Sequence, residues 1–273
     1  MIWEDIFSND AGAIKASEIR ELLKILSNPE ILSFAGGIPD PTLFPIAETT
    51  RITSRLAANG DRYRQAMQYS QTEGYQPLRR WIADRHGARH TDLSPDNVLV
   101  TNGAQQSLML LASALIDAHQ PIAVANPTYL GALQVFGTRR PHYLTVETDN
   151  DGLILESLEA AFAGGARLLY TIPDFQNPGG ISQPADRRRR IIELAHHYDV
   201  VILEDVAYRE LYYDAPPPPS LFELEGEFLG PGRWRDRGRV IQLGTISKTL
   251  MPGLRVGWTI APRPLLERLV LLK

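Results

Sequence analysis

Apolar residues along the chain follow two spacings, one typical of amphipathic helices and one typical of buried strands. Over 104–116, Leu108, Leu111, Ala112 and Leu115 fall on one face of a helix. Short apolar runs bounded by Gly, Pro or Asn predict strands. The predicted strands cover 97–101, 121–125, 142–146, 167–172, 200–204 and 239–243, with a further apolar run at 254–260. The predicted helices cover 14–27, 46–58, 74–86, 104–116, 155–162 and 187–198.

Strands that alternate with helices predict an α/β fold whose central sheet is mostly parallel and carries helices on both faces. One segment breaks this alternation. Four prolines at 216–219 favour an extended polyproline II conformation, and the Gly-, Pro- and charge-rich sequence that follows, up to 238, predicts a surface loop. No internal repeat or linker interrupts 46–273, so this range is predicted to form one large domain.

Composition and charge exclude several classes of function. A net charge of -4 disfavours a nucleic-acid-binding protein, because neutralising phosphates requires clustered positive charge. The one basic run, four arginines at 187–190, begins a predicted helix on which consecutive side chains point in different directions, so we expect a solvated helix. The absence of cysteine excludes disulfides and thiolate catalysis. The six histidines show no metal-binding spacing, so no metal site is predicted.

The sequence lacks the features of a membrane or secreted protein. Its first seven residues are acidic rather than basic and are not followed by a long apolar core. No uncharged run reaches the roughly 18 residues that a membrane-spanning helix needs. We therefore expect a cytoplasmic protein with no membrane partner and no nucleic-acid partner.

Polar residues follow the predicted strands at the points where a parallel sheet binds its ligands. Such ligands lie beyond the carboxyl ends of the strands. After 97–101 come Gly103, Ala104 and Gln105 at a predicted helix N-terminus, where free N–H groups suit a phosphate, although glycine turns before helices are also common without a ligand. The residues that follow the other strands are Tyr129, Asn177, Asp205, Tyr208 and Lys248.

Lys248 lies in a loop between two apolar runs, with Pro252 and Gly253 forcing a turn after it. An amine held at a strand end can form a Schiff base if its surroundings favour the neutral form, whereas most lone loop lysines are simply solvated. The residues at the neighbouring strand ends favour the Schiff-base interpretation over that of a solvated lysine. Pyridoxal phosphate has a phosphate, a flat ring, a ring nitrogen, a phenolic oxygen and an aldehyde, and the residues at successive strand ends suit each of these groups.

Three motifs at these strand ends form a recognisable set. They are Asn177-Pro178 in a Gln-Asn-Pro-x-Gly loop, Asp205-x-x-Tyr208, and Ser247-Lys248 followed by Pro-Gly-Leu-Arg-x-Gly-Trp. Together they resemble the class I/II aminotransferases, which are pyridoxal phosphate enzymes of fold-type I. Further motifs are similar to the branch that contains 2-aminoadipate and aromatic transaminases and the effector domains of aminotransferase-like transcription regulators. They are Ser-Phe-Ala-Gly-Gly-x-Pro at 33–39, Tyr69-x-x-x-x-Gly74 and Asn-Pro-Thr-Tyr at 126–129.

The resemblance implies catalytic roles for Lys248, Asp205 and Tyr208. Lys248 is expected to form the internal aldimine with pyridoxal 5'-phosphate and then to shuttle the α-proton of the substrate. Asp205 is expected to pair with the pyridine N–H, which keeps the ring able to accept electrons. Asn177 and Tyr208 are expected to hydrogen-bond the phenolic oxygen, while Tyr129 stacks on the ring.

The resemblance also implies a phosphate site, a substrate side and a partner subunit. Gly37 and Asn177 are assigned to the substrate side. Tyr69 matches a tyrosine that reaches the cofactor phosphate of the partner subunit in this family, which implies a homodimer. The residues expected around the phosphate are Gly103, Ala104, Gln105, Thr245 and Arg255.

The sequence departs from the family pattern at its end. Family members continue into a smaller C-terminal domain that carries the arginine for the substrate α-carboxylate, whereas this sequence stops at Lys273. We therefore expect 46–273 to form the large cofactor-binding domain without the small C-terminal domain. Residues 1–45 are expected to form an N-terminal arm and helix on the small-domain side.

Three functions are compatible with these residues. The first is an aminotransferase that moves an amino group between an α-amino acid and a 2-oxo acid, with activity impaired if the C-terminal domain is missing. The second is a degenerate or regulatory module that binds the cofactor without turnover. The third is another pyridoxal phosphate reaction, such as that of a lyase or decarboxylase, because Lys248 and Asp205 would serve these reactions as well.

Overall fold

The computed structural model describes residues 2–12, 37–87 and 90–273. The predicted helix at 14–27 and most of the motif at 33–39 lie outside the described residues. Within the part that is described, every helix is too short or too polar to span a bilayer.

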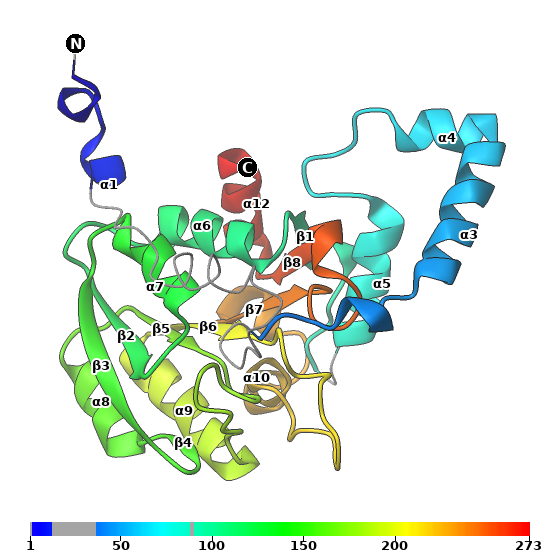
Figure 1. Ribbon diagram of the computed structural model, residues 1–273. Coiled ribbons are helices and arrows are strands. Elements are labelled where there is room, and N and C mark those ends of the chain that lie inside the picture. Colours follow the sequence, from blue (N-terminus) through cyan, green and yellow to red (C-terminus); the bar gives the residue numbers. More distant parts are fainter. Residues whose placement is uncertain (1, 13–36, 88–89) are drawn as a thin grey trace, which may run out of the picture.

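The described residues build one eight-stranded sheet in the order β1-β8-β7-β6-β5-β2-β3-β4 (Figure 1). Strands β7, β6, β5, β2 and β3 run parallel, whereas β8 is antiparallel to both of its neighbours and β4 is antiparallel to β3. The prediction of a mostly parallel sheet is therefore confirmed. The strands are β1 Val98–Thr101, β2 Pro121–Asn126, β3 His142–Asp149, β4 Gly152–Leu153, β5 Leu168–Thr171, β6 Val201–Asp205, β7 Val240–Thr245 and β8 Gly257–Ile260.

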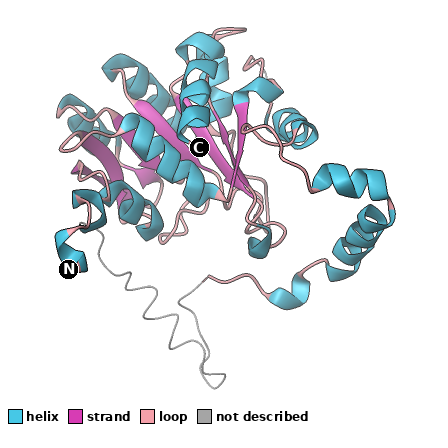
Figure 2. Cartoon of the chain, turned by 90° about the horizontal axis from the view of Figure 1, so that it is seen from above, coloured by secondary structure: helices cyan, strands magenta, loops and turns pink. Residues whose placement is uncertain are grey.

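Helices cover both faces of the sheet, as predicted (Figure 2). Side chains alternate along each strand, so β5 sends Leu168 and Tyr170 to one face and Leu169 to the other. The helices on the first face are α6 Ala104–Leu115, α7 Leu130–Gly137 and α12 Arg263–Leu272. Those on the second face are α5 Gln76–His86, α8 Leu155–Ala163, α9 Ala185–Tyr198, α10 Leu221–Leu229 and α11 Trp234–Arg237.

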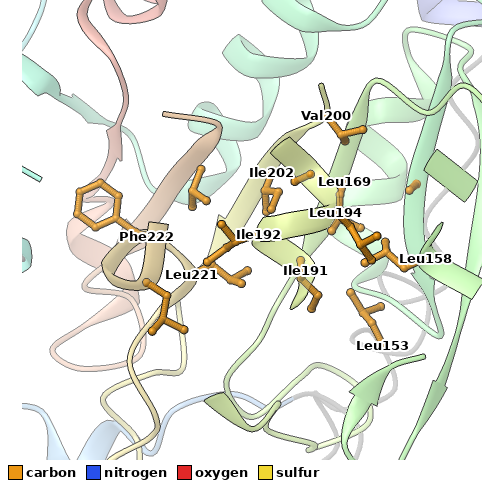
Figure 3. Close-up of a cluster of buried hydrophobic side chains, with 14 of the residues drawn as sticks. Leu153, Leu158, Leu169, Ile191, Ile192, Leu194, Val200, Ile202, Leu221 and Phe222 are labelled. Carbon is orange, nitrogen blue, oxygen red and sulfur yellow. The ribbon is translucent and has the colours of Figure 1, made fainter. Parts of the chain in front are cut away.

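Figure 3 shows the core on the second face, where Ile191 and Ile192 of α9 lie among Leu158 of α8, Leu169 of β5 and Phe222 of α10. All five side chains are buried. The core therefore fixes α9 and α10 against the strands whose carboxyl ends carry the predicted site.

The segment from 221 to 237 was predicted as a surface loop, and this prediction was wrong. Ser220 Oγ accepts the Glu223 N–H at 3.1 Å, and the Glu223 carboxylate accepts the Ser220 N–H at 2.6 Å, which together form a capping box at the start of α10. Phe222 and Trp234 are completely buried and pack edge to face with ring centroids 4.9 Å apart. The capping box and this aromatic pair stabilise helices in the segment, although its glycines and charges are typical of a loop.

The four arginines at 187–190 also differ from the expectation of a solvated helix. Arg189 and Arg190 are exposed, but Arg188 is completely buried. Its guanidinium donates to Asp174 at 2.5 Å and to the carbonyls of Gln183 and Pro173. Arg188 therefore joins α9 to the loop that follows β5.

Two helices, α3 Ile46–Ala58 and α4 Gly60–Ala66, form an arm that projects away from the sheet (Figures 1 and 2). Neither helix contains a buried residue. The remaining short elements are α1 Asn9–Gly12 and the 3-10 turns η1 Trp3–Asp5, η2 Pro41–Leu43, η3 Pro95–Asn97 and η4 Pro252–Leu254. The turn η4 occupies the start of the apolar run at 254–260, so only its last residues form β8.

Candidate functional site

A cavity of about 860 Å³ lies at the carboxyl ends of β5, β6 and β7. It is lined by ten of the twelve residues that the sequence assigns to the site. These are Gly37, Ala104, Gln105, Tyr129, Asn177, Asp205, Tyr208, Thr245, Lys248 and Arg255. The fold therefore gathers residues separated by more than 200 positions around one space.

Lys248 lies three residues after the end of β7, in the loop that the sequence predicted. Its amine is 3.4 Å from the Gly37 carbonyl oxygen and 5.8 Å from the centroid of the Tyr208 ring. Burial lowers the pKa of Lys248 below the value of 10.5 for an exposed lysine. The neutral and nucleophilic form of the amine is therefore more accessible than on a solvated lysine.

Asp205 is the last residue of β6 and is buried, with 4% of its surface exposed. One carboxylate oxygen accepts the Ala207 N–H at 3.1 Å, and the other accepts the Tyr170 hydroxyl at 2.9 Å. Burial raises the pKa of Asp205, and these two hydrogen bonds lower it. The site thus holds a buried carboxyl group whose charged form depends on two neutral donors.

Tyr208 and Asn177 meet across the cavity from different loops. The Asn177 side-chain amide donates to the Tyr208 hydroxyl at 3.1 Å. Burial raises the pKa of Tyr208, and the hydrogen bond from Asn177 opposes this effect. A phenol and an amide donor are thereby held side by side, next to Asp205.

An ion network positions the two loops that carry this pair. Asp174 accepts from Arg188 and, with its other oxygen, from Arg209 at 2.9 Å. Arg209 adjoins Tyr208 in sequence and also donates to Glu223 at 3.0 Å. Because Asp174 precedes Asn177 by three residues, the network fixes both loops relative to α9 and α10.

The opposite end of the cavity combines a helix N-terminus with a guanidinium group. Gly103 precedes α6 with φ +79°, and the first N–H groups of a helix, here those of Ala104 and Gln105, have no intrahelical acceptor. Arg255 lies directly beside Gly103 and donates to the Asn102 carbonyl oxygen at 3.2 Å. Free N–H groups, the positive end of the helix dipole and an arginine together favour an anion at this end.

Thr245 is the last residue of β7 and lines the same cavity. Its hydroxyl donates to the Val256 carbonyl oxygen at 3.0 Å and accepts the Ser247 N–H at 3.1 Å. These bonds hold the start of the Lys248 loop against Val256, the residue that directly precedes β8.

The chain is similar to known proteins in sequence and in fold. The family model for aminotransferase class I and II matches residues 47–273. The chain belongs to this family. It is 42% identical over 269 residues to 2-aminoadipate transaminase of Thermus thermophilus, a match that covers 98% of the chain and 64% of the relative. It is 36% identical over 281 residues to aromatic-amino-acid aminotransferase 1 of Thermococcus litoralis, covering 99% of the chain and 64% of that protein.

A solved aminotransferase structure has the same fold. The crystal structure of LysN, the α-aminoadipate aminotransferase of Thermus thermophilus complexed with N-(5'-phosphopyridoxyl)-L-leucine, is 41% identical, with a TM-score of 0.88. The match covers the whole of the chain and 65% of LysN. The chain thus spans about two thirds of the length of these relatives.

Two predicted site residues do not line the cavity. Gly103 lies beside Arg255, where a Cβ atom would come within 2.6 Å of the guanidinium. Tyr69 is 99% exposed on the segment between α4 and α5. Gly103 thus borders the cavity, while Tyr69 faces away from the rest of the described chain.

Tyr170, the donor to Asp205, was missed by the sequence analysis. Its strand, Leu-Leu-Tyr-Thr, reads as apolar core, and the side chain is indeed completely buried. The available signal was its hydroxyl group, because a buried tyrosine usually needs a hydrogen-bond partner.

Proposed function

We propose that the chain binds pyridoxal 5'-phosphate and belongs to an aminotransferase that moves an amino group between an α-amino acid and a 2-oxo acid. The observation that carries this proposal is the convergence of Lys248, Asp205, the Asn177–Tyr208 pair and the α6 N-terminus on one cavity. An amine, a buried carboxylate, a phenol and an anion site each suit a different part of one cofactor. The name and bound compound of LysN support the same cofactor.

The donors of the cavity fit the cofactor at both ends. The phosphate would bind to the N–H groups of Ala104 and Gln105 and to Arg255, with Gly103 leaving room for the guanidinium. The ring would lie against Tyr129, whose own ring occupies the space left by the missing side chain of Gly131.

When bound, pyridoxal phosphate supplies an aldehyde that condenses with amines and a ring that accepts the electron pair left by a departing α-proton. Lys248 would hold and move that proton at its Nζ atom, because its lowered pKa favours the neutral amine. Asp205 would hold a proton on the ring nitrogen through its charged carboxylate. Asn177 and Tyr208 would orient the ring by donating hydrogen bonds to its phenolic oxygen.

Cofactor binding is tested by adding pyridoxal phosphate to the wild-type protein and recording its visible absorption. The matched pair of variants is Lys248→Ala and Lys273→Ala. Lys273 lies outside the cavity and donates to the main-chain carbonyls of Thr72 and Val100. We expect Lys248→Ala to lose the absorption of the attached cofactor and Lys273→Ala to keep it. A wild-type protein whose spectrum equals that of free cofactor would refute the proposal.

The reaction is tested in single turnovers with a panel of α-amino acids that includes 2-aminoadipate and aromatic amino acids, after the names of the relatives. An aminotransferase releases one equivalent of the 2-oxo acid. Release of carbon dioxide and an amine would assign a decarboxylase instead. Cofactor binding without any product would assign a module that binds the cofactor without turnover.

We also propose that the protein is a homodimer in which the α3–α4 arm meets the second copy. No residue of either helix is buried, and Ile52, Tyr63 and Met67 expose apolar surface. Tyr69 follows this arm and is fully available to a second site. Light scattering coupled to size-exclusion chromatography should give twice the mass of the chain. A measured mass equal to that of one chain would contradict the dimer.

A further inference from the structure

Tyr170 lies inside the sheet behind the candidate site and contacts Asp205 directly. It belongs to β5, where it pairs with Leu203 of β6, two residues before Asp205. Its hydroxyl donates to one Asp205 oxygen at 2.9 Å, and none of its own surface is exposed. The neighbouring strand therefore supplies a hydrogen bond to the carboxylate from the side away from solvent.

The Tyr170 side chain has little freedom to leave this position. Its ring packs edge to face on Phe136 of α7, with centroids 5.5 Å apart and an interplanar angle of 76°. Its main chain is paired on both sides, with β6 and with Val124 of β2. Burial raises the pKa of Tyr170 well above its ordinary value, so the hydroxyl remains a donor throughout the neutral pH range.

The charge on Asp205 depends on few partners. Among the ion pairs of the described residues, none includes Asp205. The hydroxyl of Tyr170 and the N–H of Ala207 are the two donors, one to each oxygen. Because each oxygen accepts one hydrogen bond, the rotation of the carboxylate is restricted and its charged form is favoured.

We infer that Tyr170 is a positioning residue that keeps the Asp205 carboxylate charged and aligned toward the ring nitrogen of the cofactor. This inference rests on the proposed function. A donor to the charged form of a carboxyl group favours that form. Losing a hydrogen bond to a charged group should change the equilibrium between the charged and neutral forms of Asp205 by roughly ten-fold to hundred-fold.

The other ionisable groups that face Asp205 do not replace Tyr170. Tyr129 follows β2 and Tyr208 follows β6. Burial raises the pKa of both phenols, and the charge of Asp205 raises it further, so neither phenol stabilises that charge by titrating. Lys248, from the loop after β7, lines the same cavity. Without the Tyr170 hydroxyl, the N–H of Ala207 alone opposes the effect of burial on the pKa of Asp205.

The test compares Tyr170→Phe with the matched control Tyr143→Phe. Tyr143 lies on β3, outside the cavity, and its hydroxyl donates to the Leu133 carbonyl oxygen at 3.2 Å. The first readout needs no cofactor: infrared titration of the Asp205 carboxyl group, assigned with Asp205→Asn. We expect a higher pKa of Asp205 in Tyr170→Phe and an unchanged one in Tyr143→Phe.

The second readout uses the loaded enzyme. Tyr170→Phe should lower kcat at least ten-fold, with little change in the KM of the amino acid, while Tyr143→Phe behaves as wild type. Because a phenylalanine could loosen the core, 3-fluorotyrosine at position 170 serves as a second variant. It keeps the ring and is a stronger donor, so it should shift the pKa of Asp205 in the opposite direction.

An Asp205 pKa that is the same in wild type and Tyr170→Phe would overturn the inference, as would an equal shift in Tyr143→Phe. A failure of the proposed function is recognised by a different measurement: the wild-type protein would not bind the cofactor, whatever the pKa of Asp205.

Discussion

At the scale of single residues, Lys248 is the group whose surroundings change its chemistry most directly. Its amine is partly enclosed by the cavity and lies near Gly37 and the Tyr208 ring. Burial disfavours its charged form and lowers its pKa. The loop after β7 thus holds a lysine that reacts at a lower pH than an exposed one.

A pH prediction follows from this shift. Only the neutral amine attacks an aldehyde, so the rate of attachment of pyridoxal phosphate should rise with pH and level off above the pKa of Lys248. Because burial lowers that pKa, the midpoint should lie below 10.5. Stopped-flow absorbance measures the rate, with Nα-acetyl-lysine as the solvated control. A midpoint at or above that of the control would contradict the lowered pKa.

Gly103 offers a second residue-scale prediction. A Cβ atom there would lie 2.6 Å from the Arg255 guanidinium, and φ is +79°. Gly103→Ala should therefore displace Arg255 and weaken cofactor binding on the order of ten-fold, since a charge-assisted phosphate contact is lost.

The control for Gly103 is Gly165→Ala. Gly165 has φ +92°, but a Cβ atom there meets nothing within 4 Å. Both positions have a positive φ that strains an L-residue, whereas only Gly103→Ala places a Cβ atom against the Arg255 guanidinium. Equilibrium dialysis measures the affinity of both variants for pyridoxal phosphate. Equal affinities would show that cofactor binding does not depend on the space that Gly103 leaves for the Arg255 guanidinium.

At this scale, ten of the residues chosen from the sequence line one cavity, because most of them follow a strand and strand ends converge in a parallel sheet. It did not predict their partners. Tyr170 sits inside an apolar strand, and Arg188 was taken as one of four solvated arginines. Such pairings depend on neighbours that are distant in the sequence, so local patterns do not contain them.

At the scale of elements, the buried pair of Arg188 on α9 and Asp174 after β5 ties the helix layer to the site. Both side chains are fully buried. Arg188→Met would leave the Asp174 charge buried with one cation fewer, and breaking such a pair costs about 3–5 kcal/mol. Urea denaturation should measure this loss in the free energy of unfolding.

The matched control on the same helix is Arg190→Met. Arg190 pairs with Glu193, and its side chain is 60% exposed. Exposed pairs contribute about 1 kcal/mol or less. A loss in Arg188→Met no larger than that in Arg190→Met would show that Arg209, the second partner of Asp174, suffices to hold the loop.

The capping box of α10 gives a further element-scale prediction. Ser220→Ala removes the acceptor of the Glu223 N–H and should lower the free energy of unfolding by about 1 kcal/mol. Ser113→Ala, at an exposed position inside α6, should leave stability unchanged or slightly raised, because alanine favours helices. The same thermal or urea unfolding experiment compares the two. Equal effects would mean that α10 is held by its buried face alone.

Whether a helix or strand was predicted correctly depends on how clear its pattern of apolar and polar residues is. Strands β1, β2, β5, β6 and β7 were located within two residues, because buried parallel strands form continuous apolar runs between turns. Strand β3 continues to Asp149, three residues past its predicted end, because its last residues are polar and partly exposed. Helix α7 was missed because its sequence, Leu-Gly-Ala-Leu-Gln-Val-Phe-Gly, has almost no polar face to give a helical period. In α10, the Ser-x-x-Glu cap was visible in the sequence but was outweighed by the prolines and glycines around it.

At the scale of the whole molecule, two apolar cores hold one sheet between two helix layers, and the cavity opens where β5, β6 and β7 end. The fold class could be predicted from the alternation of strands and helices, since few architectures satisfy it. The projecting α3–α4 arm could not, because a sequence pattern does not reveal where a helix packs.

The central claim is that this cavity binds pyridoxal phosphate through Lys248. The most direct test is to incubate the wild-type protein with the cofactor, reduce it with borohydride and locate the pyridoxyl group by peptide mass spectrometry. The sequence contains four lysines, Lys15, Lys24, Lys248 and Lys273, which makes the assignment unambiguous. We predict the label on Lys248 alone. Absence of label, or label on the other lysines with Lys248 unmodified, would contradict the claim.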